Sequence, residues 1–265
     1  MTWVAAADFR RAKDESLRAQ PCQVYGKVEH LNDQIMIGAV ASGLAGARLS
    51  HLGARIAVRT ALNSLRRASA AAAAAPSDAS GDRARTLYAG VIAAIQDELR
   101  SAVVDHVAPL QAFATTLSVF VAIPTGVAAM QIGSGLMVSR GRSGDYSVLF
   151  SEGATACEPT PGCVTDPDPV GRMLVSVQDG PVAFLCAASA PLEQISIRRR
   201  DGLPQKEFFG PLDRYASTAP DDEEVHRGIR SFLRSERIHG RLDHDFVLAL
   251  CGYRRQGELF GSLKS

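Results

Sequence analysis

The order of the predicted elements indicates an α+β protein in which sheets pack against helices. Short segments of strand character lie before and after two long stretches with helical periodicity, so strands and helices are segregated along the chain rather than alternating. The chain has 265 residues, of which 46% are apolar and 22% charged, and can therefore bury one full core. These observations predict a single domain over residues 1–265.

The first half of the chain is predicted to form two strands and two long helices. Residues 4–7 and 35–41 resemble short buried strands, and residues 44–67 carry apolar side chains at helical spacing. A run of alanines that ends in proline and glycine predicts a surface excursion at 68–82, because both residues end helices. The helical pattern resumes over residues 82–106.

The second half is predicted to consist mainly of strands, with a Pro/Gly-rich loop at 152–169. Two helices are expected among them, at 192–197 and at 221–234, and the second opens with acidic residues that suit the positive end of the helix dipole. The predicted strands are 115–123, 127–132, 136–139, 174–177, 182–187 and 246–251.

Charge and cysteine content argue against several classes of function. Lys and Arg (29) nearly balance Asp and Glu (28), so no general positive field attracts nucleic acid or an anionic membrane. No apolar run approaches the ~20 residues that cross a bilayer, and no secretion signal is recognisable, so we expect a cytoplasmic location. The five cysteines lack metal-site spacing; Cys186 and Cys251 lie in apolar runs and are expected in the core.

Several short motifs follow one another in an order that resembles one protein family. The segments are WVAAA (3–7), PCQ (21–23), AVASG (39–43), QIGSG (131–135), AASAPLEQ (187–194) and RLDHDFVL (241–248). Together they resemble the bacterial type 2C metal-dependent protein phosphatases, the PPM class, from Trp3 to Tyr253. The resemblance implies a β-sandwich flanked by helices on both sides, in α-β-β-α layers.

The resemblance also implies where the family's metal-binding aspartates should stand, and other residues occupy those positions here. The degenerate positions are Val24, Ser42, Ser134, Ala190 and His244, with Asp245 beside the last one and Gly43 preserved after Ser42. The family's phosphate-contacting arginine has no direct counterpart. The nearest candidates for phosphate binding are Arg10, Arg11 and Arg18.

These substitutions remove the chemistry that the family implies. Its carboxylates hold Mg²⁺ or Mn²⁺, hard ions that prefer anionic oxygens and activate a water for attack on phosphorus. Val24 and Ala190 offer no ligand atom, the two serines offer neutral hydroxyls, and His244 suits softer metals. We therefore expect no catalytic residues, no resident metal or other cofactor, and a pseudophosphatase that binds a protein partner, a kinase or a phosphoprotein, in phospho-signalling.

Two alternatives remain open. An active phosphatase or other hydrolase could hold Mn²⁺ or Mg²⁺ in a rearranged site around Asp243, His244 and Asp245. A shift of the register by one residue there would restore one carboxylate, but not those at 24, 42 or 190. The third hypothesis is an assembly component whose long helices form an interface.

Overall fold

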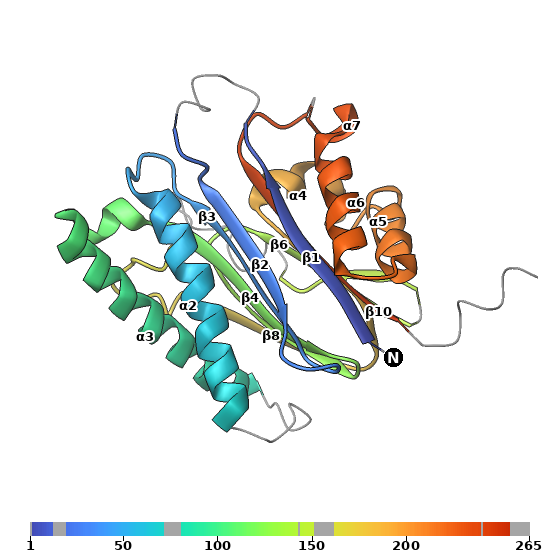
Figure 1. Cartoon of the computed structure of the whole chain (residues 1–265), viewed down its shortest axis with the longest axis horizontal. Coiled ribbons are helices and arrows are strands. Elements are labelled where there is room, and N and C mark those ends of the chain that lie inside the picture. Colours follow the sequence, from blue (N-terminus) through green and yellow to red (C-terminus); the bar gives the residue numbers. More distant parts are fainter. Residues whose placement is uncertain are drawn as a thin grey trace, which may run out of the picture.

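The computed structural model describes residues 2–12, 20–71, 81–142, 144–150, 162–239 and 241–254. Within these ranges, two five-stranded antiparallel sheets pack face to face, and helices cover the outer face of each sheet (Figure 1). This arrangement confirms the predicted α+β class and the α-β-β-α order of layers.

The first sheet has the strand order β1-β10-β9-β6-β7 and the second has the order β2-β3-β4-β5-β8. Helices α2 and α3 lie on the second sheet, and α5 and α6 lie on the first (Figure 1). The strands are β1 (Thr2–Arg10), β2 (Val24–His30), β3 (Met36–Gly43), β4 (Thr115–Ile123), β5 (Gly126–Ile132), β6 (Leu136–Gly141), β7 (Tyr146–Val148), β8 (Leu174–Asp179), β9 (Val182–Ala188) and β10 (Phe246–Arg254). The helices are α2 (Ser50–Ala71), α3 (Gly81–His106), the 3₁₀ helix η2 (Leu110–Phe113), α4 (Ala190–Ser196), α5 (Lys206–Thr218), α6 (Asp222–Arg234) and α7 (Glu236–His239).

Alternating side chains of the strands build three layers of core. In β1, Trp3 and Ala5 belong to the apolar cluster between the sheets, whereas Val4 and Ala6 belong to the cluster beneath α5 and α6. This is the period of two expected for a strand that is buried on both faces. Cys186 and Cys251 are fully buried, as predicted for core residues.

The layer above the second sheet depends on small residues in α2 and on one buried tyrosine in α3. Ala54, Ala57 and Ala61 are fully buried and let α2 approach the sheet closely. Tyr88 of α3 is also fully buried, and its hydroxyl donates a hydrogen bond to the Ala128 carbonyl at 2.7 Å. That bond satisfies the polar end of an otherwise apolar contact between α3 and β5.

Strand β2 and the start of α2 differ from the sequence-based expectations. β2 was not predicted, because its charged residues and Gly26 obscure the apolar alternation. A Cβ at Gly26 would lie 2.7 Å from Val247 Cγ2, so glycine favours the close approach of the two sheets here. The helix expected from residue 44 begins at Ser50, because the preceding residues hydrogen-bond to the chain around Ala112 instead.

Helix α5 was not predicted either. Its sequence contains Gly210 and Pro211, which normally end a helix. Here burial of Phe208, Phe209 and Leu212 against the first sheet offsets the backbone bond that the proline removes.

The two expected loops are only partly described. α2 continues to Ala71 and α3 begins at Gly81, so both ends of the excursion expected at 68–82 are helical. Residues 72–80 lie outside the described part of the chain, as do residues 151–161 of the Pro/Gly-rich loop. The remainder of that loop, from residue 162, forms turns before β8.

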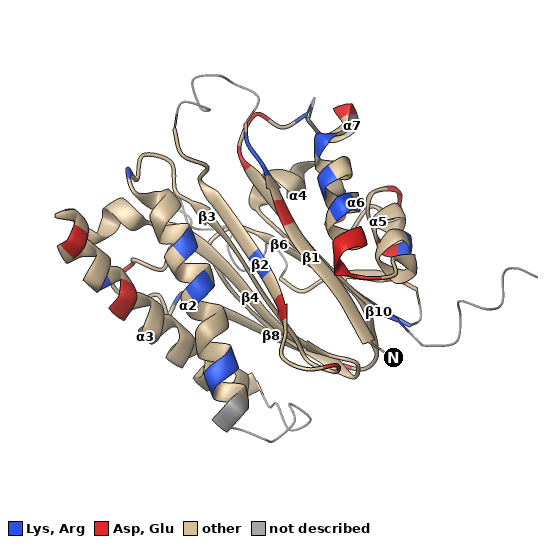
Figure 2. Ribbon diagram, viewed as in Figure 1, with Lys and Arg blue, Asp and Glu red and all other residues tan. Residues whose placement is uncertain are grey.

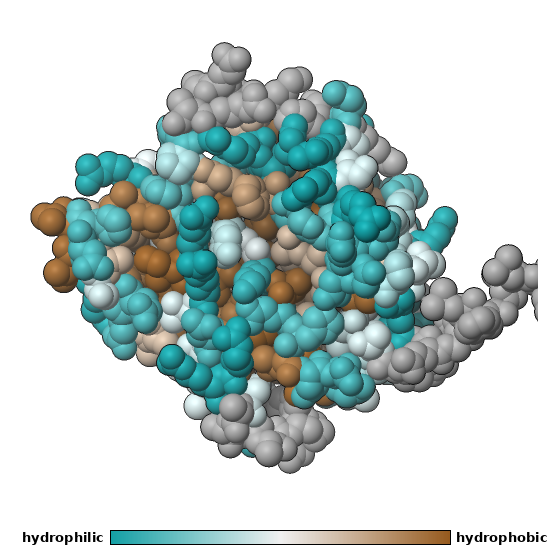
Figure 3. Space-filling view, in the orientation of Figure 1, coloured by the Kyte–Doolittle hydropathy of each residue, from teal (hydrophilic) through white to brown (hydrophobic). Residues whose placement is uncertain are grey.

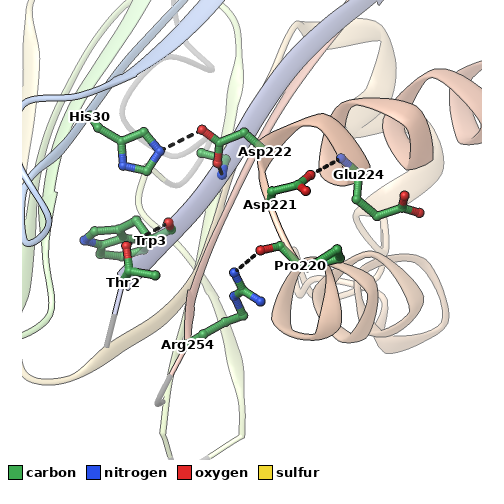
Figure 4. A network of polar contacts seen from close by, with 9 residues as sticks. Thr2, Trp3, His30, Pro220, Asp221, Asp222, Glu224 and Arg254 are labelled. Atoms are coloured by element: carbon green, nitrogen blue, oxygen red, sulfur yellow. Dashed lines mark hydrogen bonds and ion pairs between the residues drawn. The ribbon is translucent and has the colours of Figure 1, made fainter. Parts of the chain in front are cut away.

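A set of polar contacts fixes the start of α6 against the edge of the first sheet (Figure 4). Asp221 caps the helix by accepting a hydrogen bond from the Glu224 amide at 2.8 Å. Asp222 accepts one from the Ala5 amide of β1 at 2.8 Å, and its second oxygen lies 2.9 Å from His30 Nε2 in β2. These contacts join α6 to the edge strands of both sheets.

Apolar side chains gather on the surface near the C-terminal end of α3. Figure 3 shows hydrophobic surface at this end of the molecule, whereas most of the visible face is hydrophilic. Val104 and Val107 are 75% and 91% exposed. None of the described helices is both long enough and apolar enough to span a membrane.

Candidate functional site

Three of the positions at the candidate site lie in a row across the second sheet. Val24 pairs with Ser42 between β2 and β3, and Ser42 pairs with Thr116 between β3 and β4. Val24 is buried in the cluster between the sheets, and Ser42 is half-buried. This row carries a methyl-rich side chain and two neutral hydroxyls at the end of the sandwich.

The turn between β5 and β6 brings Ser134 to the same end. Gly133 has φ +77°, and a Cβ there would overlap with the Gly162 carbonyl oxygen. A Cβ at Gly135 would lie 2.9 Å from Ser118 Oγ and 3.5 Å from the Ala188 carbonyl oxygen. The turn is therefore packed tightly against β4 and the end of β9, and it leaves Ser134 exposed.

Ala190 follows at the end of β9, where the chain enters α4. The preceding Ser189 is buried and exchanges two hydrogen bonds with Val247 of β10, one from its own amide at 3.1 Å and one to its hydroxyl oxygen at 3.0 Å. These bonds fix the backbone at Ala190, but the alanine methyl itself offers no ligand atom.

Beneath these positions, the floor of the site is polar and uncharged. Ser118 and Gln131 are buried and face each other across β4 and β5. The Gln131 amide nitrogen donates to the carbonyls of Gly133 and Gly135 at 3.1 and 3.3 Å. Its carbonyl oxygen Oε1 is buried and has no hydrogen-bond partner among the described residues. The floor therefore presents a neutral acceptor instead of a carboxylate.

Among the described residues at this end of the sandwich, Asp245 has a carboxylate that accepts hydrogen bonds from the backbone. One of its oxygens accepts a hydrogen bond from the Ala12 amide at 2.7 Å, and the other accepts one from the Gln23 amide at 2.7 Å. The Gln23 carbonyl in turn accepts a bond from the Gly43 amide at 2.8 Å. Asp245 thus joins both ends of the β1–β2 connection to the start of β10, while the neighbouring His244 is exposed.

Cys22 lies beside this carboxylate and is not activated by it. Burial raises the pKa of the Cys22 thiol to about 11, and the Asp245 carboxylate contributes in the same direction. A backbone hydrogen bond with Val24 and the charge of Arg11 lower the pKa but do not offset the burial. The thiol is therefore protonated near neutrality, and thiolate chemistry is not favoured.

Of the arginines expected to bind phosphate, Arg10 and Arg11 have different surroundings. The Arg11 guanidinium donates a hydrogen bond to the Gln20 carbonyl and helps to close the β1–β2 connection. Arg10 instead lines a small cavity beside α6. Arg18 lies outside the described residues.

The described residues at the end of the sandwich do not fit a cluster of Mg²⁺ or Mn²⁺ ions. Such ions need several anionic oxygens, and the positions at the end of the sandwich supply hydroxyls, a methyl group and one carboxylate that already accepts two amide bonds. In the described ranges, no three His, Cys, Asp or Glu side chains lie close enough together to hold one metal ion.

Solved structures with a similar fold include bacterial phosphatases. The catalytic domain of the serine/threonine phosphatase PstP, in complex with two manganese ions, has a TM-score of 0.59 at 13% identity, over 95% of this chain and 99% of that one. Phosphatase Stp1 from Staphylococcus aureus has a TM-score of 0.60 at 10% identity, over 96% of both chains. A chain of the bacterial stressosome, a modular system adapted to control secondary messenger signaling, has a TM-score of 0.56 at 13% identity, over 95% of this chain and all of that one.

The chain therefore shares the fold of these phosphatases. A family model for protein phosphatase 2C matches residues 15–234, and the chain belongs to this family. This membership confirms the resemblance seen in the sequence motifs. None of the curated proteins matches the chain significantly by sequence.

Proposed function

We propose that this protein is a catalytically inactive phosphatase homologue that serves as a binding or regulatory module in phospho-signalling. The observation that carries the proposal is the donor set at the end of the sandwich. Val24, Ser42, Ser134 and Ala190 supply no charge there, and Asp245 holds the backbone.

The physical argument concerns the attacking water. In a metal-dependent phosphatase, bound cations lower the pKa of water and neutralise charge on the phosphoryl group. Neutral hydroxyls cannot hold those cations, so the chain would lose the largest contribution to the rate. A neutral cavity also repels a phosphoryl group less than an acidic one does, which is compatible with binding.

The proposed partner is a kinase or phosphoprotein in the cytoplasm, and no cofactor is required. The likeness to a chain of the stressosome supports a role in a regulatory complex, since that protein shares the fold. The near balance of acidic and basic residues supports a protein partner over nucleic acid.

The first test measures hydrolysis of p-nitrophenyl phosphate and of a phosphothreonine peptide, with and without millimolar Mn²⁺, beside the PstP catalytic domain. We expect no metal-dependent turnover above the buffer rate. Turnover near that of the control would overturn the proposal and support the rearranged metal site. In that case, Asp243→Ala and His244→Ala should remove both the activity and the binding of Mn²⁺.

A restoration experiment tests the same reasoning from the opposite side. A triple variant with Val24→Asp, Ser42→Asp and Ala190→Asp places carboxylates at the end of the sandwich. We expect this variant to melt at a lower temperature than wild type in EDTA, because like charges repel, and to be stabilised by Mn²⁺ through preferential binding to the folded state. A wild type that is stabilised by Mn²⁺ as much as the variant would contradict the proposal.

A further inference from the structure

A small basic cavity lies on the outer face of β1, away from the cluster between the sheets. Its volume is about 120 Å³, and it is lined by Asp8, Phe9, Arg10, Arg230, Leu233 and Arg234. Asp8 and Arg10 continue the series of β1 residues that face the helices. Arg230 and Arg234 are four residues apart in α6 and therefore project from the same side of that helix. Figure 2 shows Lys and Arg segments along α6, next to β1.

The charges of this outer cavity are not balanced within the described residues. Its three guanidinium groups face one carboxylate, that of Asp8, which is already bound to Arg230 at 3.2 Å and to His226 at 3.5 Å. The C-terminal end of α6 adds a partial negative charge of about half an electron, which does not offset the surplus. The cavity therefore favours an anion.

One buried donor in this cavity lacks a partner. The Nε atom of Arg10 is buried and makes no hydrogen bond within the described part of the chain. A buried, unpaired N–H of a charged group is costly unless a ligand or water satisfies it. This donor, together with the surplus of positive charge, points to an oxyanion.

We propose that the outer cavity binds the phosphoryl group of a phosphorylated serine or threonine on a protein partner. A phosphoryl ester carries a charge of about −1.5 to −2 near neutrality, which matches the surplus on the cavity. Guanidinium groups suit it because their planar N–H pairs can bind two oxygens at once.

This inference does not depend on whether the protein is an active phosphatase. The outer cavity is lined by β1 and α6, whereas the candidate site is formed by the strand ends and turns around Ser42. The two places are lined by different residues, so variants at each can separate them.

The test is a titration of the full-length protein with a short peptide that holds one phosphothreonine between leucines, followed by NMR of the arginine Nε–H groups. We expect saturable shifts of the Arg10 and Arg234 signals. Inorganic phosphate should shift the same signals, because the guanidinium groups recognise the phosphoryl oxygens. The unphosphorylated peptide should cause no shift.

Variants identify the site. Arg10→Gln and the more exposed Arg234→Glu should each weaken binding by about tenfold or more. Arg227→Gln is the matched control, because this residue lies in the same helix but pairs with Glu224. Asp8→Asn should strengthen binding, since it removes the carboxylate while keeping an acceptor for the Phe9 amide.

Three outcomes would overturn the inference. Binding unaffected by Arg234→Glu but lost in Ser42→Asp would assign the phosphoryl group to the candidate site instead. Equal binding of the phosphorylated and unphosphorylated peptides would show that no anion is recognised. No shift of the Arg10 signal with peptide or phosphate would show that the cavity is not an anion site. Metal-dependent hydrolysis, by contrast, would overturn only the proposed function.

Discussion

Removal of the Asp245 carboxylate should destabilise the fold without any loss of metal binding. Asp245→Ala deletes both acceptors of the Ala12 and Gln23 amides, and Ala12 is fully buried. Hydrogen bonds to a charged group contribute about 1.5–3 kcal/mol each, and partial exposure reduces this, so we expect a loss of about 2–4 kcal/mol in the free energy of unfolding. At 265 residues the melting temperature should fall by about 4–7 °C.

The assay is calorimetry or thermal fluorescence, with Asp243→Ala as control. Asp243 is an exposed neighbour two residues away, and its loss should cost less than about 0.5 kcal/mol. Asp245→Asn keeps one acceptor, so its melting temperature should lie between those of Asp245→Ala and Asp243→Ala. The reasoning is refuted if Asp245→Ala has the same melting temperature as the Asp243→Ala control. It is also refuted if Mn²⁺ stabilises wild type but not Asp245→Ala, because Asp245 would then be a metal ligand.

Three further predictions concern buried charge, backbone strain and thiol reactivity. Asp213→Ala should lower the free energy of unfolding by about 2–4 kcal/mol in urea titrations, because it leaves the largely buried Arg140 guanidinium without its carboxylate partner. A loss as small as that for replacement of an exposed residue would contradict this. Gly133→Ala should lower the free energy of unfolding by about 2 kcal/mol or more in the same titrations. Gly202→Ala should lower it by about 1 kcal/mol, because Gly202 also has a positive φ but has open space around it. Equal losses would count against the close approach of Gly133 to the Gly162 carbonyl oxygen. Because the pKa of Cys22 is raised to about 11, its thiol stays protonated below that pH. Alkylation, followed by mass spectrometry, should therefore be slow at pH 7 and accelerate as the pH rises. A rate at pH 7 equal to that of the urea-unfolded chain would exclude the raised pKa.

The sequence predicted best those elements whose signals are local. The helix expected at 221–234 is present as Asp222–Arg234, because acidic residues and the Asp221 cap mark its start. The missed helix α5 contains a glycine and a proline, and it forms because aromatic side chains are buried against a distant sheet. Packing of this kind leaves no local pattern in the chain.

Sequence reasoning also recovered only part of the candidate site. Motif order placed four substituted positions at one end of the sandwich, where the structure brings them together, while their correspondence to metal positions remains a prediction. The role of Asp245 was missed because its two hydrogen bonds span 222 and 233 residues. Arg10 and Arg11 were grouped as neighbours, but Arg10 lines the cavity beside α6, whereas Arg11 donates a hydrogen bond to the Gln20 carbonyl.

The edge of β1 limits how a partner can approach. An edge strand with free amides is a template for strand addition by another chain. Here the Ala5 amide donates to Asp222 and the Phe9 amide donates to Asp8, so two of the groups that an incoming strand would need are already occupied. Carboxylates at these points would also repel the carbonyl oxygens of such a strand. A partner at this side therefore has to recognise side chains, and self-assembly through edge-to-edge pairing of β1 is disfavoured.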